Sequence, residues 1–358
     1  MSQGSDSSTS AFMLSISNAN TSLVSFSTTF DIKFYPKKPR SKAVHQRWIS
    51  HEKDSAQKGG KNVGPKSIND LQSSLSNHFD SSTEGRVRQR TGYLWLKKEV
   101  IAKDIQIKGK DEKPILSVFK LPPHLVNTLE ACIKLPLNEQ GFDIPKRDTY
   151  AQGDHSFDAF HFCYYFRYRP SGKDAPITVH PDNIVLTSKP TLHPSEYFPK
   201  ESRSIQNNME LYARLQETLE PTIAWALAKV LSNDSEMSKT ITSASSALPM
   251  TVNTVTDPFP SFVLNVGVMC EPHRDINDLA GCIIIPIGHF EGGELMLVEP
   301  KLVAEIGHGD VVAFNSADFT HGNLPFRGER ASLVIQMDRA ATSYQENGQF
   351  WDLNNFVH

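Results

Sequence analysis

The sequence predicts a mostly β core with helices packed on one face, in which the strands form a double-stranded β-helix, a jelly-roll barrel. Two observations indicate this α+β fold. From Phe262 onward, short apolar runs are separated by turns, and short strands at regular spacing are typical of such barrels. The runs lie at residues 262–269, 282–287, 293–298, 310–315 and 331–337. Upstream, two segments have apolar residues at helical spacing, which predicts helices that cover one sheet.

The amino-terminal part of the chain differs from the rest in charge. Residues 1–30 are rich in Ser and Thr and lack periodicity, which predicts a flexible tail. Residues 31–110 form a basic segment, because residues 1–110 hold 18 Lys and Arg against 9 Asp and Glu, a net charge of +9. Residues 111–358 hold 19 against 31, a net charge of −12. The basic segment is a candidate nucleic-acid contact, and a solvated arm is the alternative.

Basic side chains alternate with aromatic ones near the end of this segment. Arg86, Arg88 and Arg90 precede Tyr93 and Trp95. Cations beside rings suit phosphate contacts and base stacking. We expect one or two of the arginines to contact a nucleic acid, and the two aromatic side chains to pack inward on a strand.

Targeting signals are weak in this sequence. The basic cluster Lys37–Arg40 is typical of a short nuclear-import signal, so we expect a nuclear or cytoplasmic location. The first 30 residues lack the basic region and apolar core of a secretory signal, which argues against secretion. No run approaches the roughly 18 apolar residues of a membrane span. The four cysteines show no CxxC spacing, which predicts free thiols in a reducing compartment.

Helical periodicity appears in two segments before the barrel. Residues 123–135 and 205–232 each carry an apolar stripe, and the second helix could break near Pro221. Between them, residues 157–170 are dense in aromatic residues, which predicts a buried strand. Residues 232–258 are rich in Ser and Thr and predict a flexible insert directly before the barrel core at about 260–340.

The residues with the clearest chemistry are His273, Asp275 and His321. Two imidazoles and one carboxylate form the metal-binding set of non-haem Fe(II) oxygenases, which leaves coordination positions open. His321 follows Asp275 by 46 residues, a gap long enough for several strands to return the chain to the metal.

A basic anchor follows this set on the last predicted strand. Arg330 and Ser332 are two residues apart, so their side chains share one face of the strand. The planar guanidinium fork of Arg330 suits a dicarboxylate. Asn265, on the strand before His273, is a further candidate contact for such a ligand, with a satisfied edge-strand amide as the alternative.

The pattern His273-x-Asp275…His321…Arg330-x-Ser332 resembles the 2-oxoglutarate- and Fe(II)-dependent dioxygenases. The segments "PHRDIND" and "RASLVIQ" are most similar to the TET/JBP branch, as a stand-alone catalytic domain of fungal type. This resemblance covers roughly residues 260–340 and implies a cupin-like dioxygenase domain over 111–358. It implies Fe(II) held by His273, Asp275 and His321, 2-oxoglutarate held by Arg330, Ser332 and Asn265, and O₂ as oxidant.

On this resemblance we expect an enzyme that oxidises methyl groups on DNA bases after flipping the base out of the duplex. The substrate would be 5-methylcytosine, oxidised to hydroxymethyl and further forms, or N6-methyladenine, which would be demethylated. Arg274 and Asn277, beside the metal ligands, and Arg86, Arg88 and Arg90 are candidate substrate contacts. The expected partner is duplex DNA carrying methylated bases, and no membrane or protein partner is evident.

Three alternatives remain open at the level of sequence. The same barrel could serve a small-molecule 2-oxoglutarate-dependent hydroxylase, because a fold does not decide a function. An RNA methyl-base dioxygenase would use the same residues. A non-enzymatic nucleic-acid-binding protein with a degenerate barrel would not require the complete set of metal ligands together with Arg330.

Overall fold

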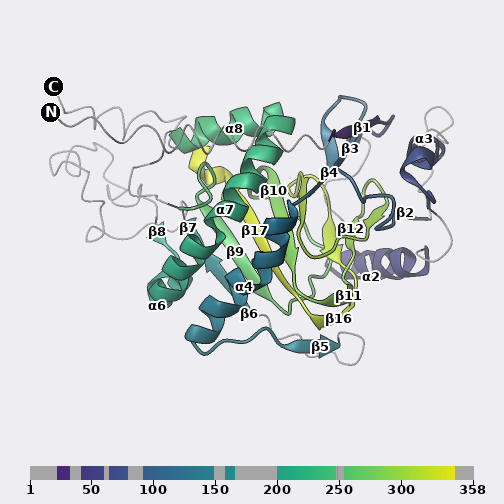
Figure 1. Cartoon of the computed structure of the whole chain (residues 1–358). Helices are drawn as coiled ribbons and strands as arrows, with labels where there is room; N and C mark the ends of the chain where they lie inside the picture. The colour runs from purple at the N-terminus through teal and green to yellow at the C-terminus, as the bar shows by residue number, and fades with distance from the viewer. Residues whose placement is uncertain are drawn as a thin grey trace, which may run out of the picture.

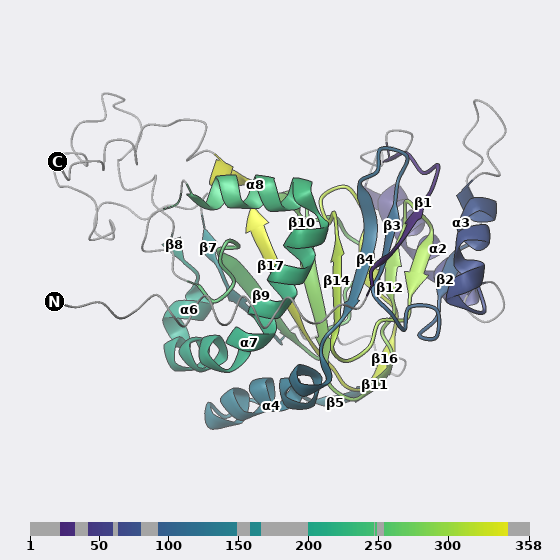
Figure 2. The same cartoon turned by 45° about the horizontal axis from the view of Figure 1, so that its top comes forward.

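The computed structural model describes residues 22–32, 42–59, 64–79, 92–148, 158–165, 200–246, 248 and 254–342. In these ranges an eight-stranded sheet forms the centre, with helices on one face and a smaller sheet on the other (Figures 1 and 2). No helix among the described residues is both long and apolar enough to cross a bilayer.

The core strands form the predicted double-stranded β-helix, because the chain passes repeatedly between the two sheets. In the large sheet four core strands lie in the spatial order β14 (Asp310–Phe314), β10 (Asp278–Ile287), β17 (Ala331–Asp338), β9 (Ser261–Val266). In the small sheet three lie in the order β15 (His321–Asn323), β12 (Leu295–Leu297), β13 (Leu302–Ala304). Neighbouring core strands run antiparallel, and the turns between them enclose a jelly-roll barrel.

Further strands extend both sheets beyond the barrel. The large sheet continues through β6 (Asp158–Phe162) on one side and β4 (Pro114–Lys120), β3 (Ile105–Lys108) and β1 (Val24–Ser27) on the other. The small sheet gains β2 (Leu94–Leu96), parallel to β13. Two smaller sheets consist of β11 (Phe290–Gly292), β16 (Phe326–Glu329) and β5 (Lys146–Asp148), and of β7 (Tyr164–Tyr165) and β8 (Lys200–Glu201).

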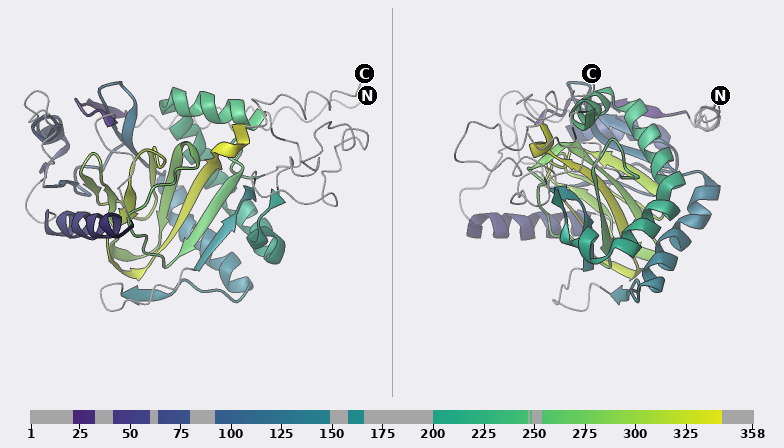
Figure 3. Two further views of the ribbon diagram at one scale, coloured as in Figure 1. Left: turned by 180° about the vertical axis from the view of Figure 1, so that it is seen from behind. Right: turned by 90° about the vertical axis from the view of Figure 1, so that its left-hand side faces the viewer.

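Helices cover the outer face of the large sheet, as Figure 3 shows from two sides. They are α4 (Pro123–Glu139), α6 (Arg203–Asn207), α7 (Met209–Asn233) and α8 (Ser235–Ser246). Alternate residues of the strands, such as Ile283 and Leu333, face these helices and are fully buried against residues such as Leu129 and Leu215. This apolar layer holds the sheet rigid from behind. The strand residues between them face the barrel interior.

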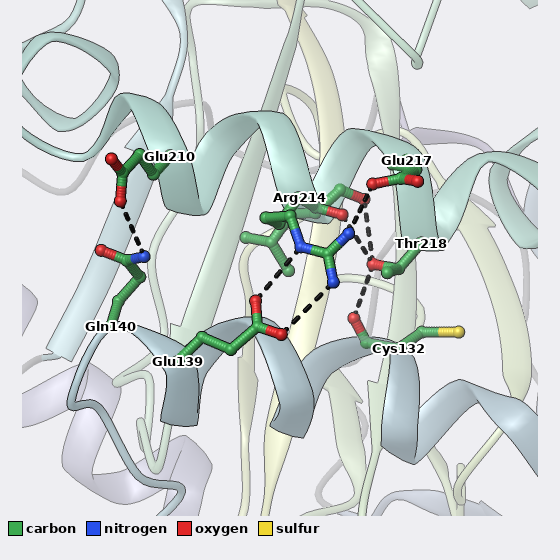
Figure 4. A network of polar contacts seen from close by, with 8 residues as sticks. Cys132, Glu139, Gln140, Glu210, Arg214, Glu217 and Thr218 are labelled. Atoms are coloured by element: carbon green, nitrogen blue, oxygen red, sulfur yellow. Dashed lines mark hydrogen bonds and ion pairs between the residues drawn. The ribbon is translucent and has the colours of Figure 1, made fainter.

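Polar contacts join helices α4 and α7 at their exposed edges (Figure 4). Arg214 of α7 pairs with Glu139 of α4 at 3.1 Å and with Glu217 on its own helix at 2.6 Å. The Thr218 hydroxyl donates to the carbonyl of Cys132 at 2.8 Å. These surface contacts fix the crossing of α4 over α7, while the buried stripe supplies most of the stability.

Elements from the basic segment pack against the small sheet, one on its outer face and another at the core between the two sheets. They are α2 (Lys42–Gly59), the short turn η2 (Ile68–Asp70) and α3 (Leu71–Phe79). The Tyr93 hydroxyl donates to Glu52 of α2 at 2.6 Å, and the Trp95 indole nitrogen donates to the carbonyl of Ala56 at 3.1 Å. Both aromatic side chains are buried, as the sequence predicted.

Several sequence expectations are confirmed at the level of elements. The helices expected at 123–135 and 205–232 are α4 and the α6–α7 pair, and the five apolar runs contain β9, β10, β12, β14 and β17. The buried strand expected over 157–170 is confirmed in part: the structure has β6 and β7 there, burial begins only at Phe162, and residues 166–170 lie outside the described residues. All four cysteines are free thiols.

Other expectations need correction. The expected tail over 1–30 contains β1, whose residues pair with β3 in the large sheet. The insert expected to be flexible over 232–258 contains helix α8. This helix is ordered because Met237, Ile241 and Ala244 are buried in the apolar layer between the large sheet and its covering helices, here called the helical core. Helix α7 continues through Pro221, since the proline is on the exposed side and the buried stripe on the opposite side holds the helix together.

Candidate metal centre

Three side chains that are distant in sequence converge at the mouth of the barrel. His273 and Asp275 lie on the segment that joins β9 to β10, and His321 is the first residue of β15. The two histidines face each other across an isolated antiparallel bridge, with backbone N–H to carbonyl distances of 2.9 and 2.8 Å. One potential ligand atom from each of the three residues lies within 4.8 Å of the other two. Among the described residues this is the one group of His, Cys, Asp and Glu with such geometry.

The imidazole rings are oriented by backbone carbonyls. The Nδ1 atom of His273 lies 2.7 Å from the carbonyl of Glu271, and that of His321 lies 3.0 Å from the carbonyl of Phe319. A carbonyl only accepts, so each Nδ1 carries a proton, and Nε2 is the ring atom left to face the third side chain of the group. Both Nε2 atoms point to Asp275 Oδ2, at 3.6 Å from His273 and 3.4 Å from His321. Second partners of this kind are typical of metal-binding histidines.

Asp275 remains charged in this setting. Burial alone would raise the pKa of its carboxyl, but hydrogen bonds and charge from His273 and His321 hold that pKa below its usual range. Burial also tends to lower the pKa of His273, whereas the hydrogen bond and charge of Asp275 outweigh it and raise that pKa. His321 is buried, while the side chains of His273 and Asp275 are 44% and 37% exposed. The group is therefore closed on one side and open on the other.

Arg330 is a buried cation without full hydrogen bonding. It immediately precedes β17 and is 5% exposed. One terminal nitrogen lies 3.5 Å from the carbonyl of Val268, and Nε has no hydrogen-bond partner among the described residues. The rings of Phe290 and Phe326 lie 5.3 and 5.5 Å from the guanidinium carbon. Burial lowers the pKa of Arg330 to about 10, so the group stays charged at neutral pH.

Gly293 makes room for this guanidinium. Its φ of 72° lies in the left-handed region that favours glycine. A β-carbon at this position would lie 3.0 Å from Arg330 Nε. The absence of a side chain at this position therefore shapes the surroundings of Arg330.

Ser332 and Asn265 are direct cross-strand neighbours on β17 and β9. Both alternate with residues of the helical core, such as Leu333 and Leu264, so their side chains face the barrel interior. Ser332 is buried and Asn265 is partly exposed. The strands thus bring Asn265 beside Ser332 on one face of the sheet, and Ser332 follows Arg330 by two residues.

A cavity of about 230 Å³ adjoins Asp275, which is the member of the group that lines it. Its lining is mixed in character and includes His161, Tyr164, Asn277, Asp278, Gln336 and Asp338. The Ser316 hydroxyl donates to Asp278 at 2.6 Å. Burial, together with the charges of Asp275 and Asp338, raises the pKa of Asp278 to about 7. The cavity thus offers several hydrogen-bonding groups beside the three convergent side chains.

Two of the candidate substrate residues, Arg274 and Asn277, belong to the described part of the chain. Asn277 and Arg274 both line the cavity; Asn277 is exposed, whereas the guanidinium of Arg274 is bound by Glu299 at 2.5 Å and Thr320 at 3.0 Å. Arg86, Arg88, Arg90 and the cluster Lys37–Arg40 lie outside the described residues.

Sequence reasoning missed Glu299 and Gln336, which reach this region from a turn and from the end of β17. Glu299 is a single carboxylate at the end of the apolar run "LMLV". An acidic residue that ends such a run is a weak signal, because it usually marks the return to solvent.

Comparisons with known proteins add limited information. No protein-family model and no curated protein matches the chain. Among solved structures, it is similar to NgTET1 in complex with 5mC DNA, with 15% identity and a TM-score of 0.45 over 85% of this chain and 92% of that chain. It is also similar to an oxidoreductase of the 2OG-Fe(II) oxygenase family from Burkholderia pseudomallei, with 15% identity and a TM-score of 0.30 over 62% and 85%. At these values neither similarity decides the chemistry, and the fold follows from the strand topology described above.

Proposed function

We propose that this protein is an Fe(II)- and 2-oxoglutarate-dependent dioxygenase that oxidises methyl groups on DNA bases. One observation carries the proposal. The ligand atoms of His273, Asp275 and His321 converge in a jelly-roll barrel that also buries an incompletely bonded guanidinium, Arg330.

The donors fit ferrous iron. Two neutral imidazole nitrogens and one charged carboxylate are a facial set that leaves positions for further ligands. Asp275 keeps its charge and both histidines direct Nε2 toward it, so a metal would take the place of any proton held between these atoms. The partial exposure of His273 and Asp275 leaves one side free for cosubstrate and substrate.

The surroundings of Arg330 fit a dicarboxylate cosubstrate. A guanidinium that is buried with a free Nε–H is costly unless a ligand supplies an acceptor. A carboxylate meets a guanidinium at two points, and Ser332 on the same strand can add a hydroxyl donor. We assign Arg330 and Ser332 to the distal carboxylate of 2-oxoglutarate, with Asn265 as a neighbouring contact.

Iron and 2-oxoglutarate would together activate O₂, so that a methyl group becomes hydroxymethyl while 2-oxoglutarate becomes succinate and CO₂. The chain's own contribution is positioning. The carbonyls of Glu271 and Phe319 hold the two rings, and the ring of Phe314 packs at 4.9 Å against His321. The buried helical core behind the large sheet keeps these groups in place.

Two features support a methylated base as the substrate. The cavity beside Asp275 offers donors and acceptors, including Asn277 and Gln336, that suit the hydrogen-bonding edge of a heterocyclic base. The net charge of +9 over residues 1–110 favours a polyanion as partner. A base in a duplex would have to be flipped into the cavity. The 5-methyl group of cytosine and the N6-methyl group of adenine are both accessible to this chemistry.

Turnover on defined oligonucleotides tests the proposal. The purified protein would be incubated with Fe(II), 2-oxoglutarate, O₂ and duplex DNA containing 5-methylcytosine or N6-methyladenine. The DNA would then be digested to nucleosides, which mass spectrometry would identify. We expect oxidised forms of 5-methylcytosine, or adenine from N6-methyladenine, with one succinate formed for each oxidation step. The His273→Ala variant should lose both, whereas His289→Ala, at a histidine 83% exposed outside the group, should retain both.

Other substrates distinguish the alternatives. Matched methylated RNA, given in parallel, would indicate an RNA enzyme if it is consumed and the DNA is not. Intact methyl groups on all nucleic acids, with succinate formed only when a small-molecule extract is added, would indicate a small-molecule hydroxylase and contradict the proposed substrate. Absence of any succinate would contradict the enzyme itself.

A further inference from the structure

A buried carboxylate lies next to the candidate metal centre but is not one of its ligands. Glu299 lies in the turn between β12 and β13, and its side chain is 3% exposed. It accepts hydrogen bonds from a terminal nitrogen of Arg274 at 2.5 Å, from the backbone N–H of Thr320 at 2.6 Å and from the Thr320 hydroxyl at 2.7 Å. Arg274 Nε also donates to the Thr320 hydroxyl at 3.0 Å, which closes the network.

The partners of Glu299 are sequence neighbours of all three candidate ligands. Arg274 lies between His273 and Asp275, and Thr320 immediately precedes His321. One carboxylate therefore bonds to both ligand-bearing segments, which also meet through the backbone bridge of the two histidines and through hydrogen bonds between Asn323 and Cys270. The backbone N–H of Val298, beside Glu299, also donates to the carbonyl of Thr320 at 2.8 Å.

The turn that carries Glu299 is itself anchored on its other side. Lys301, two residues further on, forms an ion pair with Glu52 of α2 and lies 4.9 Å above the ring of Tyr93. The Tyr93 hydroxyl donates to the same Glu52. Because the turn is fixed against α2 and the small sheet, Glu299 can act as a rigid reference for the two ligand segments.

We propose that Glu299 is a positioning residue, which preorganises the three metal ligands through Arg274 and Thr320. This inference rests on the proposed function, since it assigns Glu299 to the metal site of that enzyme. Partners that orient metal ligands typically change metal affinity by about tenfold to a hundredfold when they are removed. If the carboxylate served stability alone, its removal would lower the folded fraction and leave the metal affinity of the folded protein unchanged.

The test is the affinity for Fe(II) under anaerobic conditions, and for Co(II) as a spectroscopic substitute, measured by calorimetry on folded protein. We expect Glu299→Gln to bind both metals about tenfold to a hundredfold more weakly and to change the visible spectrum of bound Co(II). Gln keeps the size of the side chain but places an N–H₂ group opposite a donor. Circular dichroism would establish that the variant is folded at the temperature used.

Asp104→Asn is the matched control. Asp104 is also a fully buried carboxylate, paired with Lys229 at 2.8 Å and bonded to the backbone N–H of Lys120 at 2.9 Å, and both of these partners lie outside the ligand-bearing segments. We expect this variant to lose stability and to keep the wild-type metal affinity.

A second pair of variants covers the case in which Glu299→Gln does not fold. Thr320→Ser keeps the hydroxyl and should bind metal as the wild type does, whereas Thr320→Val loses that hydroxyl and should bind more weakly. Wild-type affinity in Glu299→Gln, or in Thr320→Val if the former is unfolded, would overturn the inference.

If the proposed function is wrong, the difference appears already in the metal binding of the wild-type protein. A wild-type protein whose metal binding is absent, or is unaffected by His273→Ala, would contradict the metal centre and with it this inference. A wild-type protein that binds metal through His273, with Glu299→Gln binding equally well, would contradict only the role of Glu299.

Discussion

Arg330 is buried among two aromatic rings with one N–H unpaired, which is an unfavourable state for an isolated protein. Buried charged side chains that lack a hydrogen-bond partner in the free protein often bind a ligand. The proposed dicarboxylate would supply the missing acceptor. Replacement of Arg330 is therefore the most direct test of cosubstrate binding.

We predict that Arg330→Lys raises the KM for 2-oxoglutarate by about tenfold to a hundredfold. A lysine keeps the charge but cannot bind a carboxylate at two points, and a hydrogen bond to a charged group contributes about 1.5–3 kcal/mol. Steady-state kinetics with succinate as readout would measure this. Arg327→Lys, on exposed β16, is the control and should keep the wild-type KM. An unchanged KM in Arg330→Lys would remove the assigned role.

A second residue-scale prediction concerns Asp278, whose pKa in the folded protein is raised to about 7. An unfolded chain releases this proton near pH 4. The stability that the protonated carboxyl contributes is therefore complete below about pH 4 and is lost as the pH rises through about 7.

Asp278→Asn removes this titration and keeps an acceptor for the Ser316 hydroxyl. We expect the free energy of unfolding of the variant to increase relative to that of wild type between about pH 5 and about pH 8, because only wild type loses stability as the pH rises. Urea unfolding of both metal-free proteins at these two pH values measures it. A difference between the proteins that stays constant with pH would show that Asp278 does not titrate in this range.

At the scale of elements, helix α8 shows how a polar sequence is ordered by few apolar residues. Its twelve residues are mostly Ser and Thr, yet Met237, Ile241 and Ala244 form a buried row against the helical core. Isolated helices of this length are marginal in water, so the contact with the sheet provides the stability. The helix therefore belongs to the folded frame behind the candidate site.

We predict that Ile241→Ala lowers the free energy of unfolding by about 2–5 kcal/mol, the usual range for a fully buried Ile. Thr242→Ala, at the exposed next position, should change it by less than about 0.5 kcal/mol. Denaturant unfolding followed by circular dichroism gives both values. Equal, small effects at the two positions would mean that α8 is not packed.

At the scale of the whole molecule, charge is divided between the two parts of the chain. The net charge of +9 over residues 1–110 and −12 over residues 111–358 gives the molecule a strong electrostatic asymmetry. In the proposed function the basic part attracts the phosphate backbone, and the acidic part contains the barrel and its metal centre.

We predict that replacing Arg86, Arg88 and Arg90 with Ala weakens binding to duplex DNA and lowers the slope of log affinity against log salt. The slope should fall by about 0.9 for each arginine that contacts a phosphate. The control replaces Lys146, Arg203 and Lys239, three exposed basic residues of the acidic part, and changes the net charge equally. Fluorescence anisotropy over a salt series measures both. If the two triple variants lose affinity equally, the effect is one of net charge and the arginine segment is not a contact.

Local patterns in the sequence determined much of this protein by themselves. The apolar runs after Phe262 predict the barrel strands, and the stripes at 123–135 and 205–232 predict the helices, because alternation and helical periodicity depend only on neighbouring residues. His273, Asp275, His321 and Arg330 could be selected because few structures other than a metal site need these residue types together.

Only the tertiary structure decided which other groups surround that site. The bonds of Glu299 to Arg274 and Thr320, the free Nε of Arg330 and the place of Asp278 in a cavity depend on contacts between segments far apart in the chain. The same holds for α8 and for the unbroken α7, since burial against a distant sheet outweighs the local preferences of Ser, Thr and Pro. Such contacts leave no periodic trace in the sequence, because the partner of each residue is set by the path of the whole chain.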